Sequence, residues 1–277
     1  MNLICKSAGA IAALLLAPAA GAALIVFEAA GTNAAAITPT RDDFRAAVGG
    51  GINAGANGSF GGLRREINWD GVPNGFADAS ALPADFFNVN SPRGAVFSTP
   101  GAGFLVSANA GQSAPILFGF ANEFAAFSAQ RLFTAVSSNI TDVSFFVPGT
   151  TTAATTSAFA AIFVDVEVAN QTTMEFFDES GSSIFARAVL AGGNQGLSFL
   201  GAVAGAGERI SRVRLTSGLN TIVANGVLGN PNDDVVVMDD FLYAEPRRAV
   251  SEPAGIALAG LGLLGGLLGL RRRRQDA

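Results

Sequence analysis

The pattern of hydrophobic and polar residues predicts a domain built mostly of short β-strands. From Leu63 onward, short apolar stretches alternate with turns rich in Gly, Pro, Asn and Ser, a pattern typical of all-β domains. The expected strands are Arg64–Trp69, Ala95–Ser98, Phe104–Ser107, Ile116–Phe118, Leu132–Val136, Ile140–Val147, Ala160–Val168, Thr173–Phe177, Ile184–Val189, Leu197–Val203, Arg209–Thr216 and Val235–Tyr243.

Alternation is clearest in the expected strand Ala160–Val168, where every second residue from position 162 is β-branched: Ile162, Val164, Val166 and Val168. Successive side chains of a strand point to opposite faces, so we expect these four residues to share one buried face. Asp165 and Glu167 would then share the other face. By the same reasoning, Val213 and Leu215 are expected to point inward.

A short helix is predicted before the strands. Thr38 is a suitable N-cap, Pro39 suits the first turn, and Gly49 begins a run of glycines that would end the helix. Phe44 and Val48 are four residues apart and therefore lie on one side of a helix. We expect that side to face the core.

No long amphipathic helix interrupts the strand pattern, whereas parallel strands require crossover connections that are usually helical. We therefore expect residues 24–246 to form an all-β domain, an antiparallel jelly-roll-like β-sandwich with a short N-terminal helix. Paired phenylalanines occur at residues 86–87, 145–146 and 176–177. In a strand, each pair would place one ring in the core and the other on the opposite face, where it is covered or forms an aromatic surface for a sugar.

Composition narrows the chemistry that this chain can perform. Of its 277 residues, 49% are hydrophobic and 14% are charged, which argues against a disordered chain. There is no His, and the single Cys and single Lys are Cys5 and Lys6. Both precede the cleavage point expected below, so the mature chain would lack all three residue types. This excludes His-based triads, Cys nucleophiles, Schiff-base lysines and His/Cys zinc sites, and we expect no enzymatic activity.

The charge distribution argues against a nucleic-acid partner. The net charge is −5, but the two ends contribute the basic residues Lys6 and Arg271–Arg274. Without these residues and Asp276, 12 basic and 21 acidic residues remain, which gives the body a net charge of about −9. Nucleic acids bind to basic surfaces, so this acidic, lysine-free body does not suit them.

Residues 1–22 have the pattern of a signal peptide. Lys6 precedes an apolar run over residues 7–17, and the small residues Ala20-Gly21-Ala22 offer a cleavage point. A second possible cleavage point is Ala34-Ala35-Ala36. An uncleaved N-terminal membrane anchor is the other alternative.

Residues 250–274 form a tail with three parts. Val250, Ser251, Glu252 and Pro253 precede 17 mostly apolar residues, 254–270, and Arg271, Arg272, Arg273 and Arg274 follow. At 1.5 Å per residue, the apolar part is roughly 25 Å long, the short end of a membrane span. The arginines would remain in the cytoplasm, so the body would face outward.

This tail resembles the PEP-CTERM sorting signal of Gram-negative bacteria, whose usual motif is Val-Pro-Glu-Pro, with Ser251 in place of the first proline. The resemblance implies recognition by an exosortase-type membrane protease, cleavage near the motif, and passage from the inner membrane to the cell surface or extracellular matrix. An ordinary C-terminal membrane helix is the alternative for this segment.

Most of the body also resembles a β-sandwich domain common among PEP-CTERM proteins. The stretches REINWDGVP (65–73), FSAQRLFTAVSSNITDVSFFVPG (127–149) and DDVVVMDDFLYAEP (233–246) carry this resemblance. The family has no assigned activity. The resemblance therefore supports the expected fold and destination, and implies no catalytic residue.

The densest acidic cluster is a candidate Ca²⁺ site: Asp233, Asp234, Asp239 and Asp240. Alternation would place the first and third of these on one side of a strand and the second and fourth on the other. Carboxylate oxygens are the ligands that Ca²⁺ prefers. The alternative is turn formation, with ion pairs to Arg212 or Arg214. No other cofactor is expected.

Three further features are weighed against structural roles. Asp165 and Glu167 lie about 7 Å apart along the expected strand and could serve glycoside hydrolysis, or form a solvated strand face. Trp69 is expected to pack beneath the turn Asp70-Gly71, with sugar stacking as the alternative. Arg93 is expected to support a loop, with anion binding as the alternative.

These observations lead to three functional hypotheses. The first is an exported, non-enzymatic protein of the extracellular matrix or envelope that contacts polysaccharide. The second is a hydrolase that acts on carbohydrates through carboxylates. The third is a Ca²⁺-dependent adhesive module.

Overall fold

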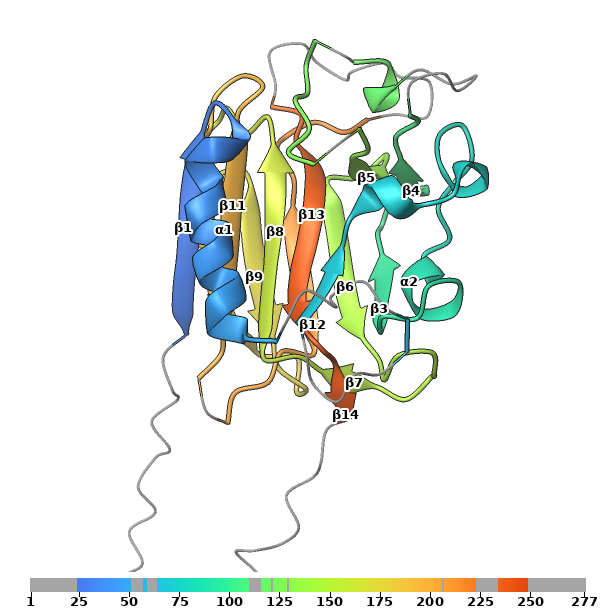
Figure 1. Ribbon diagram of the computed structural model, residues 1–277, viewed down its shortest axis with the longest axis vertical. Helices are drawn as coiled ribbons and strands as arrows, with labels where there is room; N and C mark the ends of the chain where they lie inside the picture. Colours follow the sequence, from blue (N-terminus) through green and yellow to red (C-terminus); the bar gives the residue numbers. More distant parts are fainter. Residues whose placement is uncertain are drawn as a thin grey trace, which may run out of the picture.

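The computed structural model describes residues 24–50, 57–58, 64–109, 116–120, 122–128, 130–205, 207–222 and 234–248. These residues form two antiparallel sheets that pack face to face, and helix α1 (Ala34–Val48) covers the outer side of the larger sheet (Figure 1). The expected signal peptide (1–22) and the expected tail (250–274) lie outside the described residues.

The larger sheet has seven strands in the order β1-β11-β8-β13-β5-β4, and β2 also pairs with β13. The start of β13 pairs with β5 and its end pairs with β2. The strand bounds are β1 (Ile25–Gly31), β2 (Arg64–Ile67), β4 (Gly103–Val106), β5 (Phe133–Val136), β8 (Ala158–Val164), β11 (Leu197–Val203) and β13 (Val237–Ala244).

The smaller sheet has five strands in the order β10-β9-β12-β6-β3. Their bounds are β3 (Ala95–Ser98), β6 (Ile140–Phe145), β9 (Thr173–Phe177), β10 (Ser183–Ala188) and β12 (Arg212–Thr216). The short strands β7 (Ala154–Thr155) and β14 (Arg247–Arg248) pair at the lower end of the molecule in Figure 1. The antiparallel sandwich expected from the sequence is confirmed, and the bounds of β3, β9 and β11 are those predicted.

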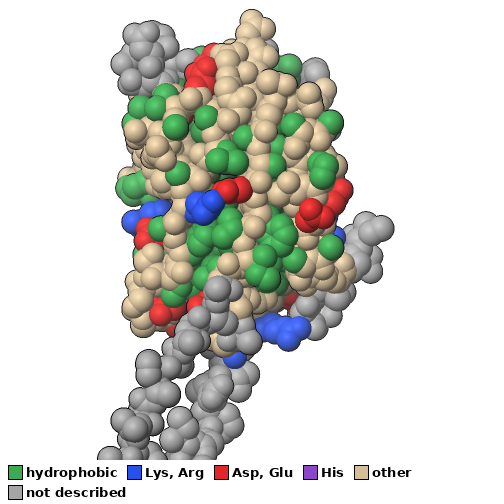
Figure 2. Space-filling model, turned by 90° about the vertical axis from the view of Figure 1, so that its left-hand side faces the viewer, with side chains coloured by type: hydrophobic (Ala, Val, Ile, Leu, Met, Phe, Trp, Pro, Cys, Tyr) green, Lys and Arg blue, Asp and Glu red, His purple; other side chains and the backbone are tan. Residues whose placement is uncertain are grey.

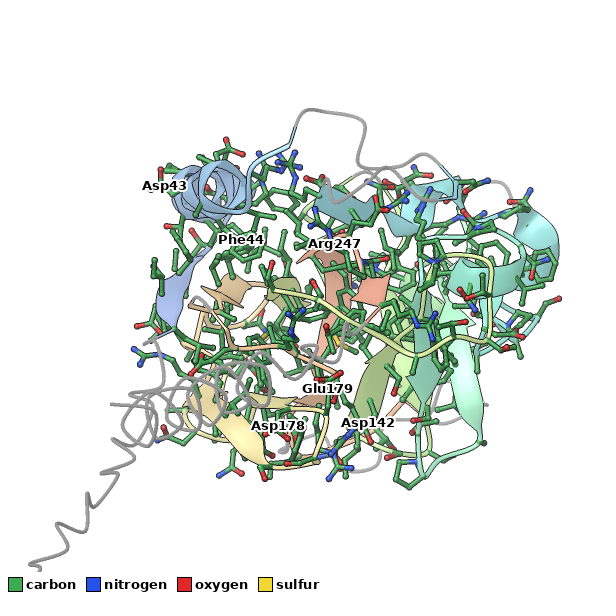
Figure 3. The ribbon with its side chains drawn as sticks, turned by 90° about the horizontal axis from the view of Figure 1, so that it is seen from below. Asp43, Phe44, Asp142, Asp178, Glu179 and Arg247 are labelled. Atoms are coloured by element: carbon green, nitrogen blue, oxygen red, sulfur yellow. The ribbon has the colours of Figure 1, made fainter. Side chains whose placement is uncertain are left out.

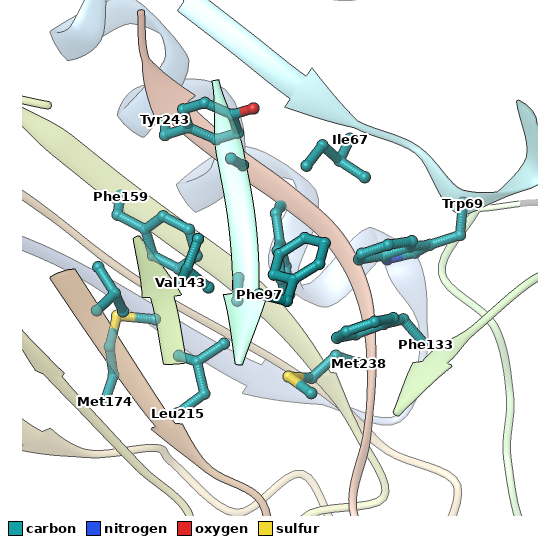
Figure 4. Close-up of a cluster of buried hydrophobic side chains, with 14 of the residues drawn as sticks. Ile67, Trp69, Phe97, Phe133, Val143, Phe159, Met174, Leu215, Met238 and Tyr243 are labelled. Atoms are coloured by element: carbon teal, nitrogen blue, oxygen red, sulfur yellow. The ribbon is translucent and has the colours of Figure 1, made fainter. Parts of the chain in front are cut away.

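Aromatic rings fill the space between the two sheets (Figure 4). Trp69 stacks on Phe133 with 4.2 Å between ring centroids, and its edge contacts Phe241 at 5.2 Å. Val213 and Leu215 of β12 are fully buried in the same cluster, as predicted. Because aromatic side chains bury large areas, this cluster supplies much of the hydrophobic stabilisation of the sandwich.

A second core lies between the larger sheet and the elements that cover its outer side. Phe44 of α1 is fully buried and contacts Phe27 and Phe199 edge to face. Figure 3 shows Phe44 pointing from α1 toward the sheet and Asp43 pointing away. A Cβ atom at Gly201 would lie 3.1 Å from the Phe44 ring, so the close approach of α1 to β11 depends on this glycine.

Helix α1 begins five residues earlier than the sequence predicted. Asn33 is the N-cap, and the Thr38 hydroxyl donates to the carbonyl of Ala34 within the helix. Pro39 therefore lies inside the helix, where it removes one backbone hydrogen bond. The additional first turn buries Ile37 against the sheet, which offsets that loss. The predicted end at Val48 is confirmed.

Strand β8 ends at Val164, four residues before the predicted end. Asp165 has a positive φ of 71°, which turns the chain out of the sheet. Val164 remains on the outer face of the sheet, but Val166 packs in the core between the sheets and Val168 is 37% exposed. The prediction of one shared face is therefore wrong for the last two of the four β-branched residues.

Several other local predictions were also wrong, because turns and short helices occupy positions where strands were expected. Residues 117–119 form the 3-10 turn η4 (Leu117–Gly119), in which all three residues have positive φ, and Ile116 before it makes an isolated bridge to Ala108 rather than a strand. The pair at 86–87 lies in the short helix α2 (Phe86–Val89), where both rings are buried. Two 3-10 turns, η2 (Trp69–Gly71) and η3 (Asn74–Phe76), follow β2. Strands β1, β7 and β14 were not predicted.

Candidate functional site

Asp234 lies before β13, and its side chain holds a loop in place. Its buried carboxylate accepts hydrogen bonds from the backbone N–H groups of Glu167 and Val168 at 3.1 and 3.2 Å. Its backbone carbonyl accepts two more, from Leu219 and Asn220. Asp234 thus joins the segment after β8 to the segment after β12. Its sequence neighbour Asp233 lies outside the described residues.

Asp239 and Asp240 lie in a bulge of β13 between Met238 and Phe241. Both carboxylates approach the hydroxyl of Ser128, with oxygen–oxygen distances of 3.0 Å for Asp239 and 3.1 Å for Asp240. A bulge inserts an extra residue into one strand and so disrupts regular alternation. It therefore brings together two side chains that were expected on opposite sides of the strand.

Asp70 brings a third carboxylate to the same hydroxyl. Its Oδ2 lies 3.2 Å from the Ser128 Oγ, and its Oδ1 accepts hydrogen bonds from the N–H groups of Gln130 and Arg131 at 2.9 and 2.8 Å. We predicted Asp70 only as a turn residue. Nothing in the spacing of residues 70, 128 and 239 links them, because only the folded sheet brings them together.

Burial raises the pKa of two of these carboxylates, those of Asp239 and Asp240. It raises the pKa of Asp239 well above its ordinary value, and the charge of Asp240 raises it further. Burial also raises the pKa of Asp240 to about 6, against the lowering effect of its hydrogen bonds with Asp239 and Ser128. Asp239 accepts the N–H of Phe127 at 2.7 Å. The group therefore anchors the segment around Ser128.

Asp165 and Glu167 do not share a face. Asp165 is fully buried at the end of β8, whereas Glu167 is exposed. The Oδ1 of Asp165 accepts the N–H of Gln195 at 2.6 Å, and among the described residues its buried Oδ2 has no hydrogen-bond partner. Burial raises the pKa of Asp165 to about 7. The predicted solvated strand face is wrong for this residue, because the strand ends before it.

The arginines of β12 pair with a residue that the sequence did not single out. Arg212 and Arg214 both contact the carboxylate of Asp142 on β6, at 2.7 and 2.8 Å. The predicted ion pairs with the acidic cluster at residues 233–240 are therefore wrong. Figure 3 shows Asp142 on the outer side of the smaller sheet.

Trp69 and Arg93 have the structural roles that the sequence predicted. The indole N–H of Trp69 donates to the carbonyl of Asp239 at 2.7 Å, and the ring is fully buried, which excludes sugar stacking. The guanidinium of Arg93 lies over the ring of Phe87 at 5.3 Å. The backbone carbonyl of Arg93 accepts a hydrogen bond from the hydroxyl of Tyr243. Arg93 thus supports the loop before β3.

Two negative findings apply to the described part of the chain. Across it, no three Asp, Glu, His or Cys side chains are grouped closely enough to hold a metal ion. In the same ranges, no helix combines the length and the apolar character needed to cross a membrane. The predicted span at residues 254–270 lies outside them.

A polar cavity of about 390 Å³ opens at the lower end of the sandwich, and we call it the base cavity. This volume falls in the range of small-molecule sites. The end of α1, the β11–β12 connection and the segments of β7 and β14 surround it (Figure 3). The polar side chains most relevant here are Thr155, Ser157, Glu208, Arg209, Glu245 and Arg247.

Glu208 is the distinctive group of the base cavity. Its Oε2 is shielded from solvent and has no hydrogen-bond partner among the described residues. Glu245, by contrast, forms a buried ion pair with Arg65 at 3.2 Å. A carboxylate oxygen only accepts hydrogen bonds. Glu208 lines the cavity, so its carboxylate can accept hydrogen bonds from a bound molecule.

Nothing in the sequence predicted the base cavity. Its charged residues follow glycines or strand ends: Glu208 and Arg209 come directly after Gly207, and Arg247 begins the last short strand. Charged residues beside a glycine turn are common on protein surfaces, so this signal alone does not identify a pocket.

A search of protein-family models found no match to this chain, and a search of curated proteins found none either.

Proposed function

We propose that this chain is an exported, surface-routed structural or interaction protein of the extracellular matrix or envelope, and that it contacts polysaccharide. Its PEP-CTERM-like tail would sort it. The observation that carries this proposal is the sequence of the tail, in which Glu252-Pro253 directly precedes an apolar stretch and Arg271–Arg274 directly follow it. An exosortase-type protease would remove this tail.

The arrangement of the body supports this destination. Strand β1 begins, and β14 ends, at the same end of the sandwich (Figure 1). The leader and the tail would therefore both join the body at one end. The opposite end would point away from the membrane while the chain is still anchored.

The structural roles of three carboxylates support a non-enzymatic body. Asp70, Asp234 and Asp239 each accept two backbone N–H groups from a loop. They hold loops in a chain that would have no disulfide. On the side over β1, charged side chains are sparse (Figure 2). Such a surface favours contacts through hydrogen bonds over contacts through charge, which suits a polysaccharide.

The strand order supports a jelly-roll topology for the sandwich. The central part of the larger sheet has the order β5-β13-β8-β11, and that of the smaller sheet has the order β6-β12-β9-β10. From β5 to β13, the chain moves repeatedly between the two sheets. Two interlocked Greek keys of eight strands have this form. Strand β1 and helix α1 would then be additions at one edge.

The two other hypotheses have less support. A hydrolase needs two accessible carboxylates on either side of a cleft, whereas Asp165 is buried and Glu167 is exposed. For a Ca²⁺ module, Asp239 and Asp240 approach Ser128, but Asp234 holds a different loop. The proposal therefore includes no catalytic step and no metal.

The test is the fate of the full chain in a bacterium that carries an exosortase-type protease. We expect the wild-type chain in the surface or matrix fraction without its tail. The Glu252→Ala variant should remain in the inner membrane with the tail attached, and Glu179→Ala, which makes the same change outside the tail sequence, should behave as wild type. Full-length protein in the cytosol, with Met1 and Ala277 both present, would disprove the proposal.

A further inference from the structure

We infer that the base cavity binds a neutral sugar unit of a polysaccharide, with Glu208 accepting hydrogen bonds from its hydroxyls. This inference rests on the polysaccharide contact proposed above and gives that contact a location. The cavity was defined by Thr155, Ser157, Glu208, Arg209, Glu245 and Arg247.

The hydrogen-bonding character of the lining selects the ligand. Glu208 lines the cavity with a carboxylate, which only accepts hydrogen bonds, and Arg209 lines it with a guanidinium, which only donates them. A hydroxyl group both donates and accepts. A molecule that carries several hydroxyls can therefore satisfy both side chains at once, and the hydroxyls of Thr155 and Ser157 can donate to it or accept from it.

The charges of the lining argue for a neutral molecule. Two glutamates and two arginines line the cavity, so the lining has no net formal charge. Glu245 is already paired with Arg65 in the interior. An anionic ligand would meet the carboxylate of Glu208, and a cationic ligand would meet the guanidinium groups. A neutral polyhydroxylated ligand avoids both repulsions.

The position of the cavity suits a polymer rather than a free sugar. Residues of β7 and β14 line the cavity, and these two strands pair at the lower end of the molecule in Figure 1, beside the last described residues. Glu208 is half-buried and Arg209 is exposed. A sugar in the cavity would therefore have its neighbours in the chain pass out into solvent.

The experiment uses the full-length chain in a polyoxyethylene detergent, which contains no sugar. Saturation-transfer NMR would follow the binding of maltotriose, cellotriose, mannotriose and galactotriose, with trigalacturonate as an anionic probe. We expect at least one neutral trisaccharide to bind more tightly than trigalacturonate. The Glu208→Gln variant should bind it at least tenfold more weakly, because the amide removes the charged acceptor.

Glu179→Gln is the matched control, since it makes the same change at an exposed position outside the cavity. It should bind as wild type. Hydrogen–deuterium exchange of the wild-type chain gives a second measurement that needs no variant. The trisaccharide should protect the β11–β12 connection and residues 155–157.

Each outcome decides a separate point. If a neutral trisaccharide binds but Glu208→Gln and the exchange pattern are unaffected, the base cavity is the wrong site and the polysaccharide contact stands. If no neutral trisaccharide binds below 50 mM, or trigalacturonate binds best, the inference is overturned. Sorting through the tail is judged by its own localisation experiment and survives either result.

Discussion

The two sheets of the sandwich bury their residues in different ways. In the larger sheet, every residue of β8 and β13 is buried, because the core between the sheets covers one face and α1 with the segment around Phe124 covers the other. In the smaller sheet, buried and partly exposed residues alternate along β6, β9 and β12. The larger sheet is thus an inner layer, and the smaller sheet has one face toward solvent.

The surroundings of the carboxylates differ between the two sheets in the same way. Asp165, at the end of β8, is buried beside other acidic residues, and burial raises its pKa. Asp142 on β6 is also partly desolvated, but its hydrogen bonds with Arg214 and Arg212 lower its pKa overall. Asp165 accepts a backbone N–H group, whereas Asp142 on the solvated face pairs with two arginines.

The largest expected effect comes from uncovering the larger sheet. Phe44→Ala should lower the free energy of unfolding by about 3–5 kcal/mol, because it leaves a cavity between α1 and the sheet. Phe177→Ala on the outer face of the smaller sheet is the matched change. It removes a ring over which Arg212 lies at 3.7 Å, and should cost roughly 1 kcal/mol.

Urea unfolding of the full chain measures both variants. Trp69 is the only tryptophan and is fully buried, so its fluorescence reports the core. Equal losses for the two variants would contradict the distinction between a covered sheet and a solvated one.

An intermediate effect is expected from pH. The pKa of Asp165 is about 7 in the folded chain against an ordinary value of 3.8. Between these two pH values, the folded state holds a proton that the unfolded state has lost. The contribution of Asp165 to the free energy of unfolding is therefore complete below pH 3.8 and declines as the pH rises through 7. The opposite sign holds for Asp142, whose contribution is lost as the pH falls through its lowered pKa.

Asp165→Asn tests this prediction. The amide keeps the oxygen that accepts the N–H of Gln195 and cannot ionise. We expect the variant to have the higher Tm at pH 8, with a smaller difference at pH 5. Asp142→Asn should instead lower the Tm at pH 8. If the difference in Tm between Asp165→Asn and wild type is the same at both pH values, the prediction that this buried carboxylate ionises is wrong.

The smallest effect is expected on the solvated face. Arg214→Gln should cost less than about 1 kcal/mol, because its side chain is 39% exposed and Asp142 retains Arg212. The loss should shrink further in about 1 M NaCl, which screens exposed charges. Urea unfolding at low and high salt measures it, and a loss above 2 kcal/mol would show that this pair behaves as a buried one.

Much of the fold could be predicted from the sequence because side-chain alternation and turn residues act locally. Val213 and Leu215 point inward as predicted, and β3, β9 and β11 have their predicted bounds. The errors occur where distant contacts decide the outcome. The burial of Ile37 lengthens α1, and the left-handed backbone of Asp165 ends β8 early.

The candidate sites were harder to predict than the fold. The sequence grouped Asp234 with Asp239 and Asp240 because they are close in the chain, yet they hold different loops. It paired Asp165 with Glu167 on the assumption of a regular strand. The base cavity was missed, because β7, the β11–β12 connection and β14 are distant in sequence.

The amino-acid sequence by itself determined that this chain forms antiparallel strands, that none of its sites can use a histidine, and that Trp69 packs in the core. These properties depend on residue type and on neighbours along the chain. Only the tertiary structure decided which sheet is covered on both faces, which carboxylates meet at Ser128, and where Glu208 faces a cavity. The physical reason is that burial and hydrogen bonding depend on distance in space, and a sheet places residues side by side that are far apart in the chain.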